Sequence, residues 1–108
     1  MGSRRPKPSR LAEKLLEIRL KLELSQNEMV RRLGFQEEFD QERISKYERG
    51  KLEPPLNVLC AYADLANVFL DVLARDSLDL PKAIPARSKS LGVERTEVPS
   101  RRSQAKDK

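Results

Sequence analysis

The chain has 108 residues, of which 36% are charged, and a formal net charge of +5, so it can bury one modest core. It has no histidine and a single cysteine, Cys60, which excludes disulfide frameworks, the common zinc clusters and histidine-based catalytic triads. No apolar run approaches the ~18 residues needed to cross a bilayer and no secretion signal opens the chain, so we expect a cytoplasmic protein without membrane association, cofactor or enzymatic activity.

The positive charge is concentrated at the two ends. Residues 1–10 carry +4, residues 11–81 carry −4 and residues 82–108 carry +5. Proline, glycine and basic residues dominate positions 1–9, where we expect a flexible basic arm. Residues 81–108 are rich in serine, proline and charge, and we expect a mostly disordered basic tail. The apolar exceptions in this tail could form a short docking segment: Leu91, Val93 and Val98.

Between these ends, residues 10–80 carry helical signals, and the first predicted helix runs from about Ser9 to Glu23. Apolar residues at helical spacing place one face on a core: Leu11, Leu15, Ile18 and Leu22. The opposite face is charged and is expected in solvent: Glu13, Lys14, Glu17 and Lys21.

Two more helices follow in close succession. Ser25 and Glu28 form a capping box that opens the second helix, QNEMVRRL, and Gly34 can adopt the left-handed conformation that ends it. Asp40 is a good N-cap for a third helix, QERISKYER, which Gly50 ends in the same manner.

Two prolines, Pro54 and Pro55, set up a fourth helix, LNVLCAYADLA, which Asn67 ends. Its near-continuous apolar content predicts burial on several sides, with Cys60 as a buried, inert thiol. A short fifth helix from about Phe69 to Arg75 completes the core with Leu70 and Leu73. Five short helices with tight connections predict an all-α fold.

A helix, a turn and a second helix with a polar outer face is the order expected of a helix-turn-helix DNA reader. The segments LSQNEMVRRLG and ISKYERGKLEPPLNVLCAYADLANVFLDVL resemble the lambda-repressor-like, Xre-type helix-turn-helix family over roughly residues 10–75. The resemblance implies a compact five-helix domain that binds double-stranded DNA. The elements that carry it are Leu24-Ser25-Gln26, Leu33-Gly34, Ile44-Ser45, Glu48-Arg49-Gly50, the proline at 54 or 55, and Val68 with Leu70-Asp71.

Ile44 and Tyr47 are expected to face the core, which leaves the polar side of the third helix outward. Gln, Lys and Arg suit the base edges of the major groove, and the resemblance places the matching positions near bases. The candidates for base readout are Gln41, Glu42, Ser45 and Lys46. The alternative is that this face is simply solvated, as most charged helix faces are.

The resemblance also implies phosphate contacts and an internal ion pair. Gln26 begins the second helix, where the helix dipole favours an anion. The phosphate candidates are Gln26, Arg43, Arg49 and Lys51. Arg19 and Glu48 match a family pair that ties the first helix to the third, and we expect a structural ion pair between them.

The main departure from the family pattern is an insertion of about four residues within QEEFD, between Gly34 and the third helix. The extra residues could loop outward while Phe39 folds back as an anchor, or one of the two helices could gain a turn. In either case Glu37, Glu38 and Asp40 bring negative charge beside the proposed DNA face.

Two functions fit this sequence. The first is a sequence-specific transcriptional regulator, expected to be a repressor of a prokaryote or phage, that binds as a homodimer over two half-sites about one helical turn apart. Its expected dimer surface is formed by Leu70, Val72 and Leu73 with the LDLP segment. Residues 4–10 could follow the DNA backbone, enter the minor groove or form a solvated terminus. The alternative is an antitoxin that binds its own promoter and wraps a toxin with residues 82–108.

Overall fold

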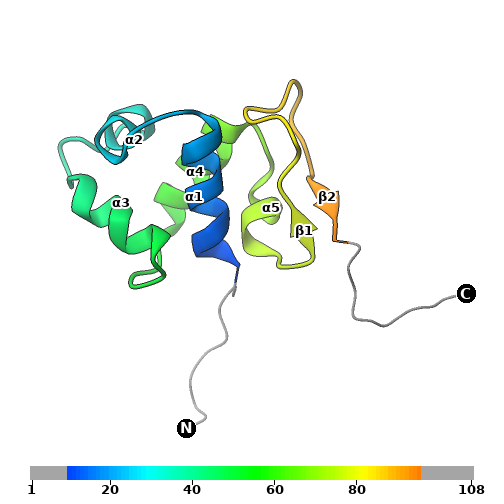
Figure 1. The fold of residues 1–108 in the computed structure, drawn as a ribbon, viewed down its shortest axis with the longest axis horizontal. Coiled ribbons are helices and arrows are strands. Elements are labelled where there is room, and N and C mark those ends of the chain that lie inside the picture. The colour runs from blue at the N-terminus through cyan, green and yellow to red at the C-terminus, as the bar shows by residue number, and fades with distance from the viewer. Residues whose placement is uncertain (1–9, 96–108) are drawn as a thin grey trace, which may run out of the picture.

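The computed structural model describes residues 10–95, which form five helices and two short strands (Figure 1). The predicted all-α fold is therefore confirmed, with a small antiparallel strand pair as an addition. Residues 1–9 and 96–108, and with them the predicted arm and Val98, lie outside the described residues. The elements are α1 Leu11–Lys21, α2 Gln26–Leu33, α3 Gln41–Glu48, α4 Leu56–Ala66, α5 Leu70–Ala74, β1 Leu78–Asp79 and β2 Val93–Glu94.

The starts of α2 and α3 and the ends of α2 and α4 lie where local side-chain chemistry predicts, whereas α1 and α5 are shorter than predicted and have no side-chain cap at their first turn. Ser25 Oγ accepts from the backbone N–H of Glu28 at 3.0 Å, and the Glu28 carboxylate accepts from the backbone N–H of Ser25 at 2.8 Å, which completes the capping box. The Asp40 carboxylate caps α3 by accepting from the backbone N–H of Glu42 at 3.1 Å. Gly34 and Asn67 end α2 and α4 with φ of +88° and +60°.

One apolar core lies between the helices and extends toward the strands. Figure 1 shows α1 in the middle of the domain, with α2 and α3 on one side and α5, β1 and β2 on the other. The predicted inward residues of α3 are buried, since Ile44 is 0% and Tyr47 1% exposed. The buried apolar residues of α1, α2 and α5 are Leu11, Leu15, Ile18, Met29, Val30, Leu33, Val72 and Leu73.

Among the described residues no helix combines the length and apolar character that a membrane span requires.

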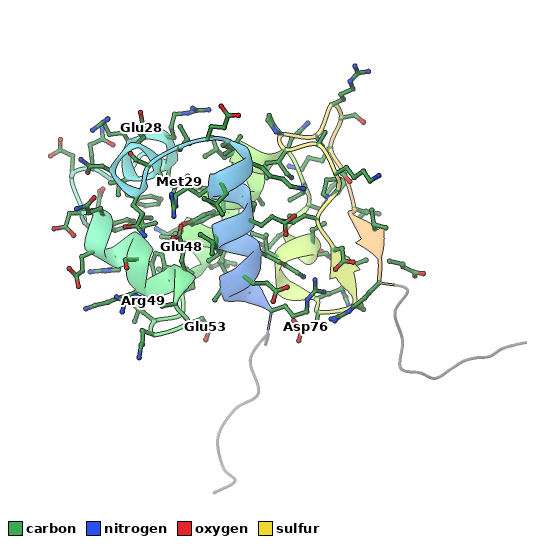
Figure 2. All side chains as sticks on the ribbon, in the orientation of Figure 1. Glu28, Met29, Glu48, Arg49, Glu53 and Asp76 are labelled. Carbon is green, nitrogen blue, oxygen red and sulfur yellow. The ribbon has the colours of Figure 1, made fainter. Side chains whose placement is uncertain are left out.

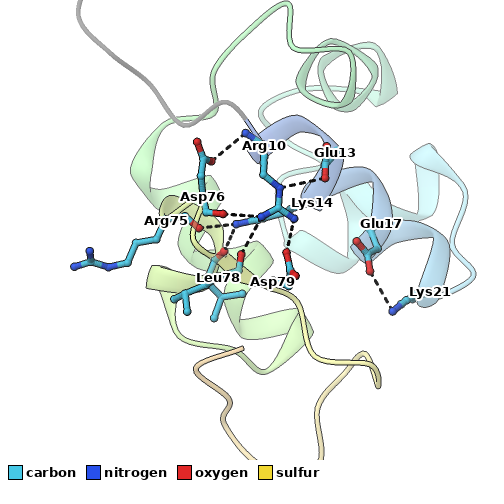
Figure 3. A network of polar contacts seen from close by, with 10 residues as sticks. Arg10, Glu13, Lys14, Glu17, Lys21, Arg75, Asp76, Leu78 and Asp79 are labelled. Atoms are coloured by element: carbon cyan, nitrogen blue, oxygen red, sulfur yellow. Dashed lines mark hydrogen bonds and ion pairs between the residues drawn. The ribbon is translucent and has the colours of Figure 1, made fainter. Parts of the chain in front are cut away.

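Lys14 is buried, although the sequence predicts it on the solvent-facing side of α1. Its side chain is 1% exposed, and its ammonium group donates to the backbone carbonyls of Val72 at 2.7 Å and Arg75 at 2.8 Å. These carbonyls belong to the last turn and the end of α5, where a helix leaves acceptors without partners, so Lys14 acts as a cap supplied by another helix (Figure 3). Burial lowers the pKa of Lys14 below its usual value.

Arg10 joins the same polar network from the start of α1. Its backbone N–H donates to the Asp76 carboxylate at 3.1 Å, and its guanidinium donates to the Asp76 carbonyl at 2.7 Å and pairs with Asp79 (Figure 3). The expectation that residues 4–10 follow DNA is therefore wrong for Arg10, whose side chain is committed inside the domain. We name this set, Arg10 and Lys14 with their partners on residues 72–79, the α1–α5 network.

Residues 82–95 differ from the expected disordered tail. Ala86 donates its backbone N–H to Ala66 at 3.0 Å, and its carbonyl accepts from the Asn67 side chain at 2.8 Å. Ser90 exchanges backbone hydrogen bonds with Asn67 and Phe69 at 3.1 and 2.9 Å. Ile84 is 9% exposed. The segment packs on the domain because its backbone groups find partners at the end of α4, a pairing that side-chain composition does not reveal.

Two predictions about apolar residues are wrong. Cys60 is exposed, because α4 buries only the face that carries Val58 and Tyr62 and turns Cys60 outward. Val72 and Leu73 are expected on a dimer surface, but both are 0% exposed within the single chain, which confirms instead the core position that the fifth helix predicts for Leu73. They fill the core between α1 and α5 and are not available to a partner.

Candidate nucleic-acid interface

The outer face of α3 is polar and accessible. Gln41, Glu42 and Lys46 are exposed, whereas Ile44 and Tyr47 anchor the opposite side of the helix in the core. A helix fixed along one side presents its other side as a rigid surface, which is what reading base edges in a major groove requires. Three of the four side chains predicted for base readout thus lie together in solvent.

Ser45, the fourth predicted readout residue, is placed differently. It is half-buried, and its hydroxyl accepts from Arg49 Nε at 3.1 Å, while its carbonyl accepts from the same nitrogen at 3.3 Å. The contact places Arg49, a predicted phosphate ligand, next to Ser45 along α3. Sequence spacing alone could have suggested this pair, because residues four apart meet on one face of a helix.

An ion pair ties α3 to α1. Arg19 Nε and Nη2 donate to the two carboxylate oxygens of Glu48 at 2.6 and 3.0 Å, so the ion pair expected from the resemblance is present and is bidentate. The pair is largely shielded, with side-chain exposures of 14% and 5%. The Glu48 carboxylate raises the pKa of Arg19 above its ordinary value through the hydrogen bond between them. Figure 2 shows Glu48 on the side of α3 that faces α1, and Arg49 near the end of α3.

The same carboxylate also holds the beginning of α2. Gln26 Nε2 donates to Glu48 at 3.1 Å, and Arg19 Nη1 donates to the Leu24 carbonyl at 2.9 Å. Gln26, predicted to bind a phosphate, is thus half-buried and bonded to Glu48, at the first residue of α2. One guanidinium and one carboxylate therefore fix the relative orientation of α1, α2 and α3.

Residues 35–40, where the resemblance implies an insertion of about four residues, form a turn and leave both flanking helices at eight residues each. Phe39 folds back and packs against the core edge, with its ring 5.3 Å from Phe35 and 6.2 Å from Tyr47. The alternative with a longer helix is not what the structure shows. Glu37, Glu38 and Asp40 are exposed around this turn.

Charge is distributed unevenly along the interface. The acidic turn adjoins the N-terminal end of α3, whereas Lys46, Arg49 and Lys51 are exposed along its C-terminal half and just beyond. Phosphates should therefore approach the C-terminal end more readily than the turn. Within residues 10–95, no group of histidine, cysteine or carboxylate side chains is arranged to hold a metal ion.

Comparison with known proteins agrees with this geometry. A helix-turn-helix family model matches residues 15–73, a range that includes all five helices except the ends of α1 and α5. Searches of characterised proteins and of solved structures find no match. The family is one of DNA-binding regulators rather than enzymes. The chain belongs to the Xre/lambda-repressor-like helix-turn-helix family.

Proposed function

We propose that the protein is a sequence-specific transcriptional repressor of the cytoplasm that reads duplex DNA as a homodimer. The observation that supports this most directly is the exposed polar face of α3, held rigidly by the Arg19–Glu48 pair and by Ile44 in the core. Family membership makes DNA the ligand. Repression requires only that the bound protein exclude other proteins from its site, which a compact binder can do without a further contact surface.

The contacts divide into readout and positioning. Gln41 can form a bidentate pair with adenine, Lys46 can donate to guanine, and Glu42 can accept from the amino group of cytosine. Arg49 and Lys51, at the C-terminal end of α3, are suited to phosphates and would set the register of the helix without carrying sequence information. Gln26 Nε2 already donates one hydrogen bond to Glu48, and its second N–H is the one that would donate to a phosphate.

Dimerisation requires a surface other than the buried Val72 and Leu73. Phe69, Leu91 and Val93 are 44%, 59% and 50% exposed and come from neighbouring segments, since the Phe69 backbone donates to Ser90. Gly92 faces Val72 inside the domain, so the residues on either side of it point outward. We place the second copy on this apolar surface, Phe69–Leu91–Val93. In Figure 1, α3 and β2 lie at opposite ends of the domain, so such a dimer leaves both α3 faces uncovered.

Selection of bound sites from random duplexes tests the DNA reading. Lys46→Ala should relax preference at one base pair per half-site at a cost of ~1–3 kcal/mol, and Lys51→Ala should weaken all sites alike and lower the salt dependence of binding. Selected sites should be two-fold symmetric because the protein is a dimer. If both variants lose the same affinity on every sequence, the readout assignment is wrong.

Sedimentation of Leu91→Asp tests the dimer surface. A carboxylate at the centre of the apolar surface should produce monomers and weaken binding to a symmetric site, because burying an unpaired charge is costly. Leu56→Asp is the matched control, since Leu56 is 65% exposed at the start of α4, away from that surface. A dimer that survives Leu91→Asp would place the second copy elsewhere.

The packing of residues 82–95 on the domain reduces the part of the tail that could wrap a toxin in the antitoxin alternative. A segment that wraps a toxin would have to be free, and this part of the tail is hydrogen-bonded to α4 and to Phe69. In the antitoxin alternative the toxin-binding segment is therefore residues 96–108, which lie outside the described residues. Removal of 96–108 should leave DNA binding intact under the repressor proposal, and loss of a captured protein partner after that removal would favour the antitoxin instead.

A further inference from the structure

The inserted turn supplies an aromatic stack that ends on an arginine. The rings of Phe35 and Phe39 are stacked at an interplanar angle of 15°, and Phe39 meets Tyr47 edge-on at 85°. Tyr47 is 1% exposed, so the stack is anchored in the core through α3. On Phe39 lies the guanidinium of Arg43, whose central carbon is 5.2 Å from the ring centroid.

This contact orders a side chain that would otherwise be free in solvent. Arg43 is exposed, and an aromatic ring within ~6 Å attracts a guanidinium while leaving its N–H donors able to bind elsewhere. An arginine that is already oriented loses less rotamer freedom when it binds. The insertion therefore does more than lengthen the turn, because it provides the ring on which Arg43 lies.

The surroundings of Arg43 favour a base over a phosphate. Arg43 is the third residue of α3, and N-terminal residues of a recognition helix are those that reach base edges. The adjoining turn exposes Glu37, Glu38 and Asp40, which repel a phosphate that approaches this end of the helix. Guanine offers the neutral acceptors N7 and O6, which arginine binds through two parallel hydrogen bonds.

We infer that Arg43 is a specificity-determining residue that reads a guanine, and that Phe39 is the positioning residue that holds it. This replaces the phosphate contact expected of Arg43 from the resemblance, and it rests on the proposed DNA-binding function. The inserted turn thus sets sequence preference through Phe39, without having to touch DNA itself.

The test compares site selection and competitive binding across five single-residue variants and one double variant. Arg43→Ala should lose about tenfold discrimination at one G·C pair in each half-site, and Arg43→Lys should recover only part of it because an ammonium cannot pair in a bidentate manner. Phe39→Leu should reduce discrimination at that same base pair, whereas Phe39→Tyr, which keeps the ring, should retain it. Arg49→Ala is the matched control and should weaken all sequences by a similar factor with preference unchanged.

Each result decides the inference. Combining Phe39→Leu with Arg43→Ala should add no further loss at the G·C pair, because the ring acts through the arginine. Thermal unfolding of Phe39→Leu is measured alongside, and if this variant does not fold, the comparison of Arg43→Ala with Arg49→Ala decides. If Arg43→Ala weakens binding to every sequence equally, Arg43 contacts a phosphate and does not read a base. If Phe39→Leu folds and keeps the sequence preference of the unaltered protein, Phe39 does not position Arg43. If the unaltered protein binds no duplex, the proposed function itself fails.

Discussion

The two halves of the molecule are attached to α1 by different chemistry. On the helix-turn-helix side, Arg19 donates to the Glu48 side chain, so both partners are recognisable amino acids at fixed positions. On the other side, Lys14 and Arg10 donate mainly to backbone carbonyls at the end of α5 and before β1. Every residue offers a carbonyl, so within this second attachment only the contacts of Arg10 with the Asp79 and Asp76 carboxylates involve a recognisable side-chain partner.

The comparison has a functional consequence. The Arg19–Glu48 pair sets the angle of α3, the helix proposed to enter DNA, whereas the α1–α5 network secures the part of the domain where we place the second copy. Disturbing the first should alter binding to a single half-site. Disturbing the second should alter stability and assembly first. The predictions below separate these effects, from the largest expected change to the smallest.

Glu48→Ala should cost about 4 kcal/mol of unfolding free energy, because it leaves the shielded Arg19 guanidinium without its carboxylate. Urea unfolding measures the change, and half-site binding should fall as well because the orientation of α3 is released. Replacing both partners together, with Arg19→Met and Glu48→Leu, should restore much of the stability. The control is Glu53→Ala, at an exposed position. If Glu48→Ala and Glu53→Ala lower the free energy of unfolding by the same small amount, the Arg19–Glu48 pair is unimportant for stability.

Gly92→Ala should cost about 3 kcal/mol. At φ of +77° an added Cβ is strained, and it would lie 2.4 Å from the Asp79 carbonyl oxygen and 3.1 Å from Val72, so β2 would have to move away from β1 and α5. Gly34→Ala is the matched control, since φ is +88° there but, among residues 10–95 and apart from the adjoining backbone, no atom lies within 4 Å of the added Cβ. Thermal unfolding of the two variants separates collision from backbone strain, and equal losses would rule out the collision.

Lys14→Ala should cost about 2 kcal/mol, because two carbonyls at the end of α5 lose their donor inside the domain. Hydrogen exchange should show faster opening of α5 and β1, with α3 unchanged and half-site binding retained at temperatures where the variant is folded. The exposed Lys21→Ala should change stability by less than about 0.5 kcal/mol. Faster exchange in α3 instead of α5 would contradict the division of the molecule into two separately attached halves.

Ser25→Ala should cost about 1 kcal/mol, the smallest effect of the series, because it removes only the hydroxyl that caps α2. Chemical denaturation is sensitive enough to resolve it, and exposed Ser88→Ala should be neutral. A loss of several kcal/mol would mean that Ser25 has a second role beyond the cap.

The sequence predicted the local features well, because their causes lie within one or two turns of helix. The capping box of Ser25 and Glu28, the left-handed Gly34 and Asn67, and the inward Ile44 and Tyr47 are all decided by neighbours in the chain. The same holds for the polar face of α3, since helical spacing alone places Gln41, Glu42 and Lys46 outside once Ile44 is inside.

The tertiary structure decided the features that depend on distant partners. Lys14 is buried because the end of α5 happens to present free carbonyls to it, and residues 82–95 are ordered because the end of α4 pairs with their backbone. Cys60 is exposed because it lies on the side of α4 opposite the buried Val58 and Tyr62. The type of a side chain determines only whether burial or exposure to solvent is favourable for it. Whether an apolar residue is in fact buried, or a charged one finds a partner, depends on which elements the fold places beside it.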